Sequence, residues 1–303
     1  MRASFRGSTT MKLAHSPFEK CTFRKKTFYV KRDDLLQEDF SGNKARKFEY
    51  FLLRDFAHIK RVVSYGSNQS NAMYSLSVLA KLKGWEFVYF CDHIPSFLQK
   101  NPMGNYRYAL QNGMKIFVSS DRCKDANSLK NPQTVIIQEG GRQKESEEGI
   151  KKLALELMAD IADCGIENPY IFLPSGTGTT ALFLQKYLSF KVYTCSTVGD
   201  KEYLREQWGM IEESADYFPT ILESKKKYHY GKLYLEAYEI YKELIGDMGI
   251  EFDLLYDSIG WLKFLENIEK IEGTPIYIHQ GGLKGNESMK ARYERKYGKI
   301  FDQ

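Results

Sequence analysis

The chain has 303 residues, of which 43% are apolar and 27% charged, and its formal net charge is +5. This length allows one large α/β domain or two smaller ones, and the composition is ordinary for a globular protein. A nucleic-acid-binding protein would usually be more basic, with clustered Lys and Arg, whereas the basic runs here are no longer than three residues, as in the three lysines at residues 225–227. No stretch is apolar over a membrane-spanning length. We therefore expect neither a nucleic-acid partner nor a membrane partner.

The number and spacing of the cysteines indicate the cellular compartment and whether a metal site is expected. The number of cysteines is five, which is odd, and none forms a CxxC pair. This argues against a disulfide framework and against a zinc site, so we expect no metal and a reducing cytoplasm. The cysteines are Cys21, Cys91, Cys123, Cys164 and Cys195.

Apolar, β-rich runs alternate with helix-like segments along the whole chain. We predict strands at residues 28–32, 61–65, 86–91, 115–118, 134–138, 170–173, 191–196 and 275–279. Helical patterns lie between them, for example at residues 45–57, 70–83, 150–164, 181–190 and 232–248. Near-continuous apolar strands that alternate with helices predict parallel sheets with helices on both faces. Ligands of such sheets collect just after the carboxyl ends of the strands.

The first segment that could carry chemistry is Ser-Gly-Asn-Lys-Ala-Arg-Lys at residues 41–47, shortly after Lys-Arg-Asp-Asp at 31–34. Asn43 could cap a helix that begins near Lys44. Lys44 and Lys47 are three residues apart and share a helical face. Two ammonium groups on one face favour the neutral amine of one of them, which imine chemistry requires, and the second lysine could hold a phosphate. An ordinary basic helix start is the alternative.

The second segment is Ser-Tyr-Gly-Ser-Asn-Gln-Ser-Asn at residues 64–71, which follows a predicted strand and opens a predicted helix. Its run of hydrogen-bonding residues is long for a simple turn. Backbone amides at the start of a helix attract anions such as a carboxylate. A capped turn remains the alternative.

The third segment, Pro-Ser-Gly-Thr-Gly-Thr-Thr at residues 174–180, also joins a predicted strand to a predicted helix. Glycines let backbone amides approach an anion, and threonine hydroxyls add donors, so the segment is a candidate phosphate cup. It matches neither a Walker loop nor GxGxxG. A glycine-rich connection without a ligand is the alternative.

The fourth group joins Leu-Leu-Tyr-Asp-Ser at 254–258 to Tyr-Gly at 230–231 and His-Gln-Gly-Gly at 279–282. Taken singly, these motifs are weak. Tyr256 could be a core aromatic residue, and Asp257 could be a helix N-cap.

Together, the four segments resemble those of D-cysteine desulfhydrases and 1-aminocyclopropane-1-carboxylate (ACC) deaminases. These are pyridoxal-5'-phosphate (PLP) enzymes with the fold of the tryptophan synthase β-subunit, which is PLP fold type II. Lys-Arg-Asp-Asp followed by Gly-Asn-Lys-x-Arg-Lys resembles the start of this family. Order, rough spacing and strand-to-helix context agree from about residue 25 to residue 285.

The resemblance implies site residues at matching positions. Lys44 would hold PLP as an imine and, once freed, act as a base, and Lys47 would contact the phosphate. Asn68 would lie beside the ring oxygen of PLP, and Ser67, Asn68 and Gln69 would bind the substrate, with Ser67 also catalytic. The phosphate cup would consist of Thr177, Gly178, Thr179 and Thr180.

The resemblance also implies that Tyr230 and Tyr256 are active-site tyrosines and that Asp257 meets the pyridine nitrogen of PLP. A carboxylate there keeps the nitrogen protonated and makes the ring a stronger electron sink. ACC deaminases have an acidic residue at this position, whereas desulfhydrases commonly have Thr. Asp257 therefore favours the deaminase type.

The chain departs from the family pattern near this site. Leu254 replaces the usual Pro, Ile259-Gly260 replaces Gly-Lys, and Gln280 stands in a turn that resembles His-Thr-Gly-Gly. The chain is also somewhat short for the family. Because these departures indicate a pocket that is not closely tuned to ACC, we predict D-cysteine rather than ACC as the preferred substrate.

We predict a PLP-dependent deaminating lyase that acts on a small amino acid. The favoured activity converts D-cysteine to pyruvate, hydrogen sulfide and ammonia, and the alternative is ACC deaminase, which forms 2-oxobutanoate and ammonia. A PLP-binding protein without turnover is the alternative from a different class. Retention of Lys44, Ser67 and both tyrosines speaks against it.

The implied fold is α/β, with two three-layer α/β/α domains and mostly parallel sheets. The larger domain would combine residues 1–48 with 150–303 and bind PLP, and the smaller would span residues 49–149. PLP would lie in the cleft between them. A homodimer is expected.

Overall fold

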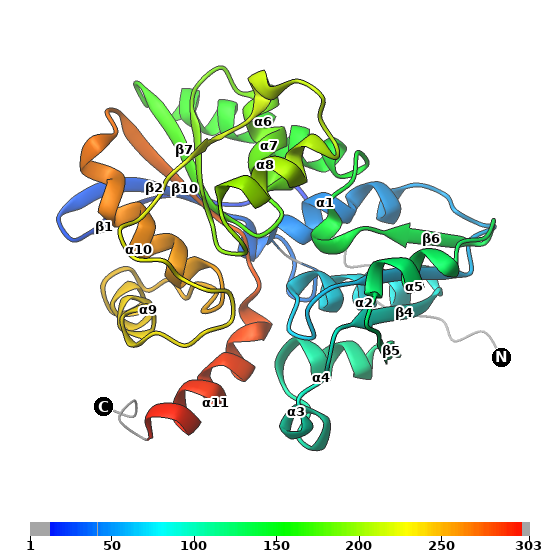
Figure 1. Cartoon of the computed structure of the whole chain (residues 1–303). Helices are drawn as coiled ribbons and strands as arrows, with labels where there is room; N and C mark the ends of the chain where they lie inside the picture. Colours follow the sequence, from blue (N-terminus) through cyan, green and yellow to red (C-terminus); the bar gives the residue numbers. More distant parts are fainter. Residues whose placement is uncertain (1–12, 41, 299–303) are drawn as a thin grey trace.

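Two sheets organise the chain in the computed structural model, which describes residues 13–40 and 42–298 (Figure 1). The larger sheet has the strand order β1-β2-β10-β7-β8-β9, and only β1 and β2 pair in antiparallel fashion. Its strands are β1 (Phe18–Phe23), β2 (Lys26–Arg32), β10 (Thr274–His279), β7 (Pro169–Ser175), β8 (Val192–Ser196) and β9 (Thr220–Ile221).

The smaller sheet is parallel throughout and has the order β5-β4-β3-β6. Its strands are β5 (Lys115–Val118), β4 (Glu86–Cys91), β3 (Arg61–Tyr65) and β6 (Thr134–Ile137). The fold class predicted from the sequence, two α/β units with mostly parallel sheets, is confirmed.

Helices cover both faces of the larger sheet because its strands are apolar on both faces. In β7, Ile171 and Leu173 face one core while Tyr170 and Phe172 face the other. The first core includes residues of α6 (Ser146–Asp163), α7 (Thr179–Tyr187) and α8 (Lys201–Gly209). The second includes residues of α9 (Leu235–Met248) and α10 (Asp257–Asn267), where the Trp261 ring stacks on Tyr277 with centroids 4.3 Å apart.

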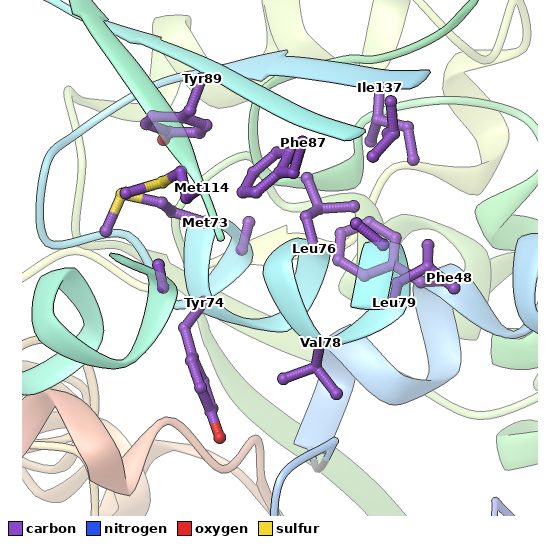
Figure 2. Close-up of a cluster of buried hydrophobic side chains, with 14 of the residues drawn as sticks. Phe48, Met73, Tyr74, Leu76, Val78, Leu79, Phe87, Tyr89, Met114 and Ile137 are labelled. Carbon is purple, nitrogen blue, oxygen red and sulfur yellow. The ribbon is translucent and has the colours of Figure 1, made fainter. Parts of the chain in front are cut away.

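The smaller sheet is also covered on both faces. One face packs against α1 (Gly42–Leu53), α2 (Asn71–Lys83) and α4 (Gly104–Gln111), and the other against α5 (Arg122–Ser128). Figure 2 shows Leu76 and Leu79 of α2 between Phe87 on the sheet and Phe48 on α1. Tyr74 points away from the sheet, and its hydroxyl donates a hydrogen bond to Asp39 at 2.8 Å.

Short helix α3 (Ser96–Lys100) precedes α4, and the last helix, α11 (Asn286–Tyr297), lies against α4. Arg107 of α4 pairs with Glu287 of α11 at 2.8 Å. Helix α11 is thereby tied to the unit built on the smaller sheet.

The helices α1 and α6 pack against each other where the chain passes between the two sheets. Phe48 of α1 belongs to the core of the smaller sheet, and Leu157 of α6 belongs to the core of the larger one. The boundaries predicted at 48/49 and 149/150 fall inside these two helices, so the division into domains at those residues stays a proposal. Residues 1–12, 41 and 299–303 of the predicted larger domain lie outside the described residues.

Two strands were not expected from the sequence, namely β1 and the two-residue β9. Three helices also begin earlier than expected, α1 at Gly42 rather than Ala45, α6 at Ser146 rather than Ile150 and α7 at Thr179 rather than Ala181. Among the described residues, the helices are too short or too polar for a membrane span.

Candidate functional site

A cavity of about 330 Å³ opens where loops from both sheets meet. Residues that follow β3, β4, β6, β7, β8 and β10 line it, so it lies at the carboxyl ends of parallel strands. All the predicted site residues except Gln69 line this cavity: Lys44, Lys47, Ser67, Asn68, Thr177, Gly178, Thr179, Thr180, Tyr230, Tyr256 and Asp257. Residues up to 213 positions apart in the sequence are therefore brought together, from Lys44 to Asp257.

Gln69 is placed differently from the expectation for a substrate-binding residue. Its side-chain oxygen accepts a hydrogen bond from Ser288 of α11 at 3.5 Å, and its backbone carbonyl accepts one from Asn105 at 3.0 Å. Because these contacts lead toward α4 and α11, Gln69 supports the loop rather than lining the cavity. Ser67 and Asn68 of the same loop do line it.

The two lysines of α1 have an environment suited to a neutral amine. The Lys44 amine donates a hydrogen bond to Asn43 at 3.0 Å. Burial lowers the pKa of Lys44 to about 8, although the negative charge of Asp253 acts in the opposite direction and raises it. The Lys47 amine donates to the carbonyl of Gly140 at 3.0 Å. Burial and the charge of Lys44 both lower the pKa of Lys47. Lys44 can therefore supply a nucleophilic amine close to neutral pH.

Asn43 does not cap the helix as its sequence position suggested. Helix α1 begins at Gly42, which places Asn43 inside the first turn. Its side-chain amide donates to Gln280 at 2.7 Å, and its backbone N–H donates to the carbonyl of Gln280 at 3.1 Å. A contact with the loop after β10 thus takes the place of a local cap.

The threonine loop, residues 177–180, joins β7 to the start of α7. Gly178 has φ +70°, and an added Cβ would lie 2.3 Å from the indole nitrogen of Trp208, so only glycine fits there. The hydroxyls of Thr177 and Thr179 lie 3.0 Å apart. The Thr180 hydroxyl oxygen is buried and lacks a hydrogen-bond partner within the described chain. A buried donor without a partner is costly, so this loop is suited to an anionic ligand that accepts hydrogen bonds.

Two buried carboxyl groups, Asp253 and Asp257, also line the cavity. Asp257, at the first position of α10, is 1% exposed and accepts a hydrogen bond from the Tyr277 hydroxyl at 2.8 Å. Burial and the nearby Asp253 raise the pKa of Asp257 well above its usual range. Burial also raises the pKa of Asp253 to about 6. A ligand group that brings a positive charge to Asp257 would offset this desolvation.

Tyr230 and Tyr256 lie side by side in the cavity, with their hydroxyl oxygens 3.1 Å apart. Burial raises the pKa of both residues. Both hydroxyls therefore stay protonated at neutral pH, and one can donate to the other or to a bound molecule.

Comparison with known proteins identifies similar chains. No family model matches. A putative 1-aminocyclopropane-1-carboxylate deaminase of Thermotoga maritima (strain ATCC 43589 / DSM 3109 / JCM 10099 / NBRC 100826 / MSB8) is 27% identical over 284 residues, which cover 85% of this chain and 89% of that protein. The chain is therefore similar to this protein over most of its length, in agreement with the resemblance that the sequence motifs indicated.

Several solved structures share the fold of this chain. The crystal structure of an ACC deaminase homologue superposes with a TM-score of 0.74 at 19% identity, covering 93% of this chain and 94% of that one. A fungal L-serine ammonia-lyase from Rhizomucor miehei superposes with a TM-score of 0.62 at 13% identity, covering 93% and 98%. The fold predicted from the sequence is confirmed, and another solved structure that shares it is that of a pyridoxal 5'-phosphate-dependent aspartate racemase, with a TM-score of 0.63 at 13% identity.

Sequence reasoning missed several residues that line the cavity. Asp253 heads the Asp-x-x-Tyr stretch, which was the one signal for it, and it accepts a hydrogen bond from Asn71 at 2.9 Å. Glu139 and Arg122, 3.2 Å apart, follow β6 and open α5. Their positions at strand ends were visible in the sequence, but their convergence depends on the order of strands in the smaller sheet.

Proposed function

We propose that the chain binds PLP in this cavity and is a deaminating lyase that acts on a small amino acid. One observation carries the proposal: a half-buried lysine with a lowered pKa, a threonine loop with an unpartnered hydroxyl and a buried carboxyl group line a single cavity. Each of them matches a different part of PLP, namely the aldehyde, the phosphate and the pyridine nitrogen.

The described residues fit the cofactor. Lys44 would hold it covalently, and the loop from Thr177 to Thr180 would bind the phosphate together with Lys47. Asn68 would lie beside the ring oxygen, and Asp257 would meet the ring nitrogen. When bound, PLP supplies an electron sink for the carbanion that forms on the substrate.

The chain's own residues would then orient the substrate and move protons. Freed from the cofactor, the Lys44 amine can take up or return a proton, because its pKa of about 8 lies near the working pH. The paired hydroxyls of Tyr230 and Tyr256 can hold a proton between them and pass it to the substrate. The backbone amides at Ser67 and Asn68 and the Ser67 hydroxyl would bind the substrate carboxylate, since both residues line the cavity.

ACC is the substrate that we propose, although sequence reasoning favoured D-cysteine. The Thermotoga maritima relative and the solved homologue both carry ACC deaminase in their names. Asp257 adds support, since a protonated pyridine suits the harder reaction of a substrate that has no α-hydrogen. The reaction takes ACC and water to 2-oxobutanoate and ammonia.

The test is an assay of 2-oxo acid formation with ACC, D-cysteine, β-chloro-D-alanine and D-serine under one set of conditions. The proposal expects the highest kcat/KM with ACC. A higher value with D-cysteine would restore desulfhydrase activity as the main function. If PLP-loaded protein forms no 2-oxo acid from any of the four, the lyase proposal fails.

Replacing both Thr177 and Thr180 with Val should weaken PLP retention. Each hydroxyl is an expected phosphate donor, and a hydrogen bond to a charged group contributes about 1.5–3 kcal/mol. Equilibrium dialysis against PLP would measure the loss of affinity. Thr274→Val serves as the matched control, because this hydroxyl donates to the carbonyl of Glu167 at 3.2 Å, at the far end of the larger sheet. Unchanged affinity in the folded double variant would place the phosphate elsewhere.

Covalent capture of PLP should accelerate as pH rises through about 8. The pKa of Lys44 lies below that of an ordinary lysine, so below this pH the amine is charged and cannot attack, whereas above it the amine is neutral. Stopped-flow absorbance after mixing cofactor-free protein with PLP would give the rate at each pH. A rate that rises only above pH 10 would mean that burial does not lower this pKa.

A further inference from the structure

A relay of side-chain amides runs from Lys44 into the larger sheet. The Lys44 amine donates to Oδ1 of Asn43 at 3.0 Å, and Nδ2 of Asn43 donates to Oε1 of Gln280 at 2.7 Å. Nε2 of Gln280 then donates to the backbone carbonyl of Pro174 at 2.6 Å. Three hydrogen bonds thus connect α1, the loop after β10 and strand β7.

The direction of this relay is fixed by its end in the sheet. The carbonyl of Pro174 can only accept, so the amide nitrogen of Gln280 must face it and the amide oxygen must face Asn43. Asn43 then turns its own nitrogen toward Gln280 and its oxygen toward Lys44. The Lys44 amine therefore faces the acceptor Oδ1 of Asn43 whether the amine is charged or neutral. A neutral amine must donate an N–H to Asn43, which leaves its lone pair free for another direction.

The backbone holds the relay in register. Gly42 has φ +63°, and an added Cβ would lie 1.8 Å from the carbonyl oxygen of Gln280. The backbone N–H of Asn43 donates to that same oxygen at 3.1 Å. The start of α1 and the loop after β10 are thus in direct contact, which keeps the two amide side chains within reach of each other.

The relay matters because the Lys44 side chain lines two cavities and could extend into either of them. A second cavity of about 490 Å³ adjoins the first, and Lys44 and Gln280 line both cavities. Asn43 lines only the cavity that contains the threonine loop. A lysine side chain loses much rotamer freedom when it is fixed in one direction, so a specific partner is needed to hold it.

We propose that Gln280 is a positioning residue which, through Asn43, holds the Lys44 amine toward the cavity of the threonine loop and keeps its lone pair free. The inference rests on the proposed function only in assuming that this cavity holds the cofactor. The position of the amine itself can be tested without any cofactor. The charged groups that face Lys44 are Asp253 and Lys47, and a change at Gln280 alters neither of them.

The experiment compares Gln280→Met with the unmodified protein and with Gln185→Met, all free of PLP. Gln185 is a matched control: its side-chain amide bonds to the backbone of Phe190 and Val192, away from the cavity. Each protein is labelled with acetic anhydride over a range of pH, and mass spectrometry follows the peptide that contains Lys44. The profile gives the apparent pKa of Lys44 and the limiting rate of its neutral amine.

In Gln280→Met, the amide of Asn43 is free to turn and donate to the neutral amine. We expect the limiting rate at high pH to fall about 3- to 10-fold, which corresponds to one hydrogen bond that occupies the lone pair, and the apparent pKa of Lys44 to decrease. Gln185→Met should keep both values of the unmodified protein. If Gln280→Met unfolds at a lower temperature than the unmodified protein, Gln280→Ala is used in its place, because it removes the amide without adding bulk.

Two results would overturn the proposal. One is a limiting rate and an apparent pKa in the Gln280 variant that equal those of the unmodified protein. The other is an equal change in both variants, since that would reflect general loosening of the fold. Neither result depends on whether the protein turns over ACC, so a failure here is distinct from a failure of the proposed function.

Discussion

Replacing Lys44 with Ala is expected to lower 2-oxo acid formation by about 10³- to 10⁴-fold, close to complete loss. A positioned general base contributes about 10²- to 10⁴-fold, and this variant loses the covalent attachment of the cofactor as well. The amine cannot be replaced by a neighbour, because Lys47 is held on the carbonyl of Gly140. Steady-state rates at saturating PLP measure the effect.

Lys47→Ala is the matched control, since it removes the other lysine of the same helix face, which is buried. This variant should bind PLP more weakly but retain the covalent linkage when PLP is in excess. Turnover by Lys44→Ala within tenfold of the unmodified protein would contradict the role assigned to Lys44. If Lys47→Ala loses the covalent linkage to PLP while Lys44 is intact, Lys47 would be the residue that holds the cofactor and Lys44 the one that contacts the phosphate.

Replacing Asp257 with Thr is expected to lower kcat/KM for ACC by about 10²- to 10³-fold, a loss typical of one preorganised electrostatic contact. A threonine cannot keep the ring nitrogen protonated, so the electron sink weakens. β-Elimination from D-cysteine should fall less, within about tenfold, since thiolate is a good leaving group and the α-proton can be removed by a lysine. The measurement compares kcat/KM for the two substrates in both proteins.

Asp257→Asn separates charge from shape at this position. It keeps an acceptor for the Tyr277 hydroxyl, which lies 2.8 Å from the carboxylate, but it cannot carry a negative charge. We expect it to resemble Asp257→Thr in its loss of ACC turnover. Full ACC activity in Asp257→Asn would show that the charge of this residue does not support the electron sink.

The strands were predictable because buried parallel strands are encoded by local runs of apolar residues. Strands β3, β4 and β5 have the bounds expected from the sequence. Strand β1 was missed since only Phe23 at its end is buried, and the other positions are half-exposed or exposed. Its formation depends on antiparallel pairing with β2, which local composition does not reveal.

Local signals also indicated the loops that line the cavity. Gly-Asn-Lys, Ser-Asn-Gln and the threonine loop each follow or open an element, and the structure brings them to one cavity. Contacts between distant segments were beyond sequence reasoning. The start of α1 at Gly42 depends on the backbone of Gln280, and the placement of Asp253 depends on Asn71, which lies 182 positions away.

The position of Gln69 shows the same limit. The motif Ser-Asn-Gln implied a residue near the substrate, but the side chain contacts Ser288, 219 positions later in the chain. The C-terminal helix was not among the predicted elements, so no partner for Gln69 could be foreseen.

The most direct test of the central claim is borohydride reduction of the PLP-loaded protein followed by peptide mapping. If Lys44 holds the cofactor, the unreduced protein absorbs as a PLP imine, and reduction fixes a single phosphopyridoxyl group on the peptide that contains Lys44. An adduct on another lysine, or no adduct in protein that retains its fold, would contradict the account.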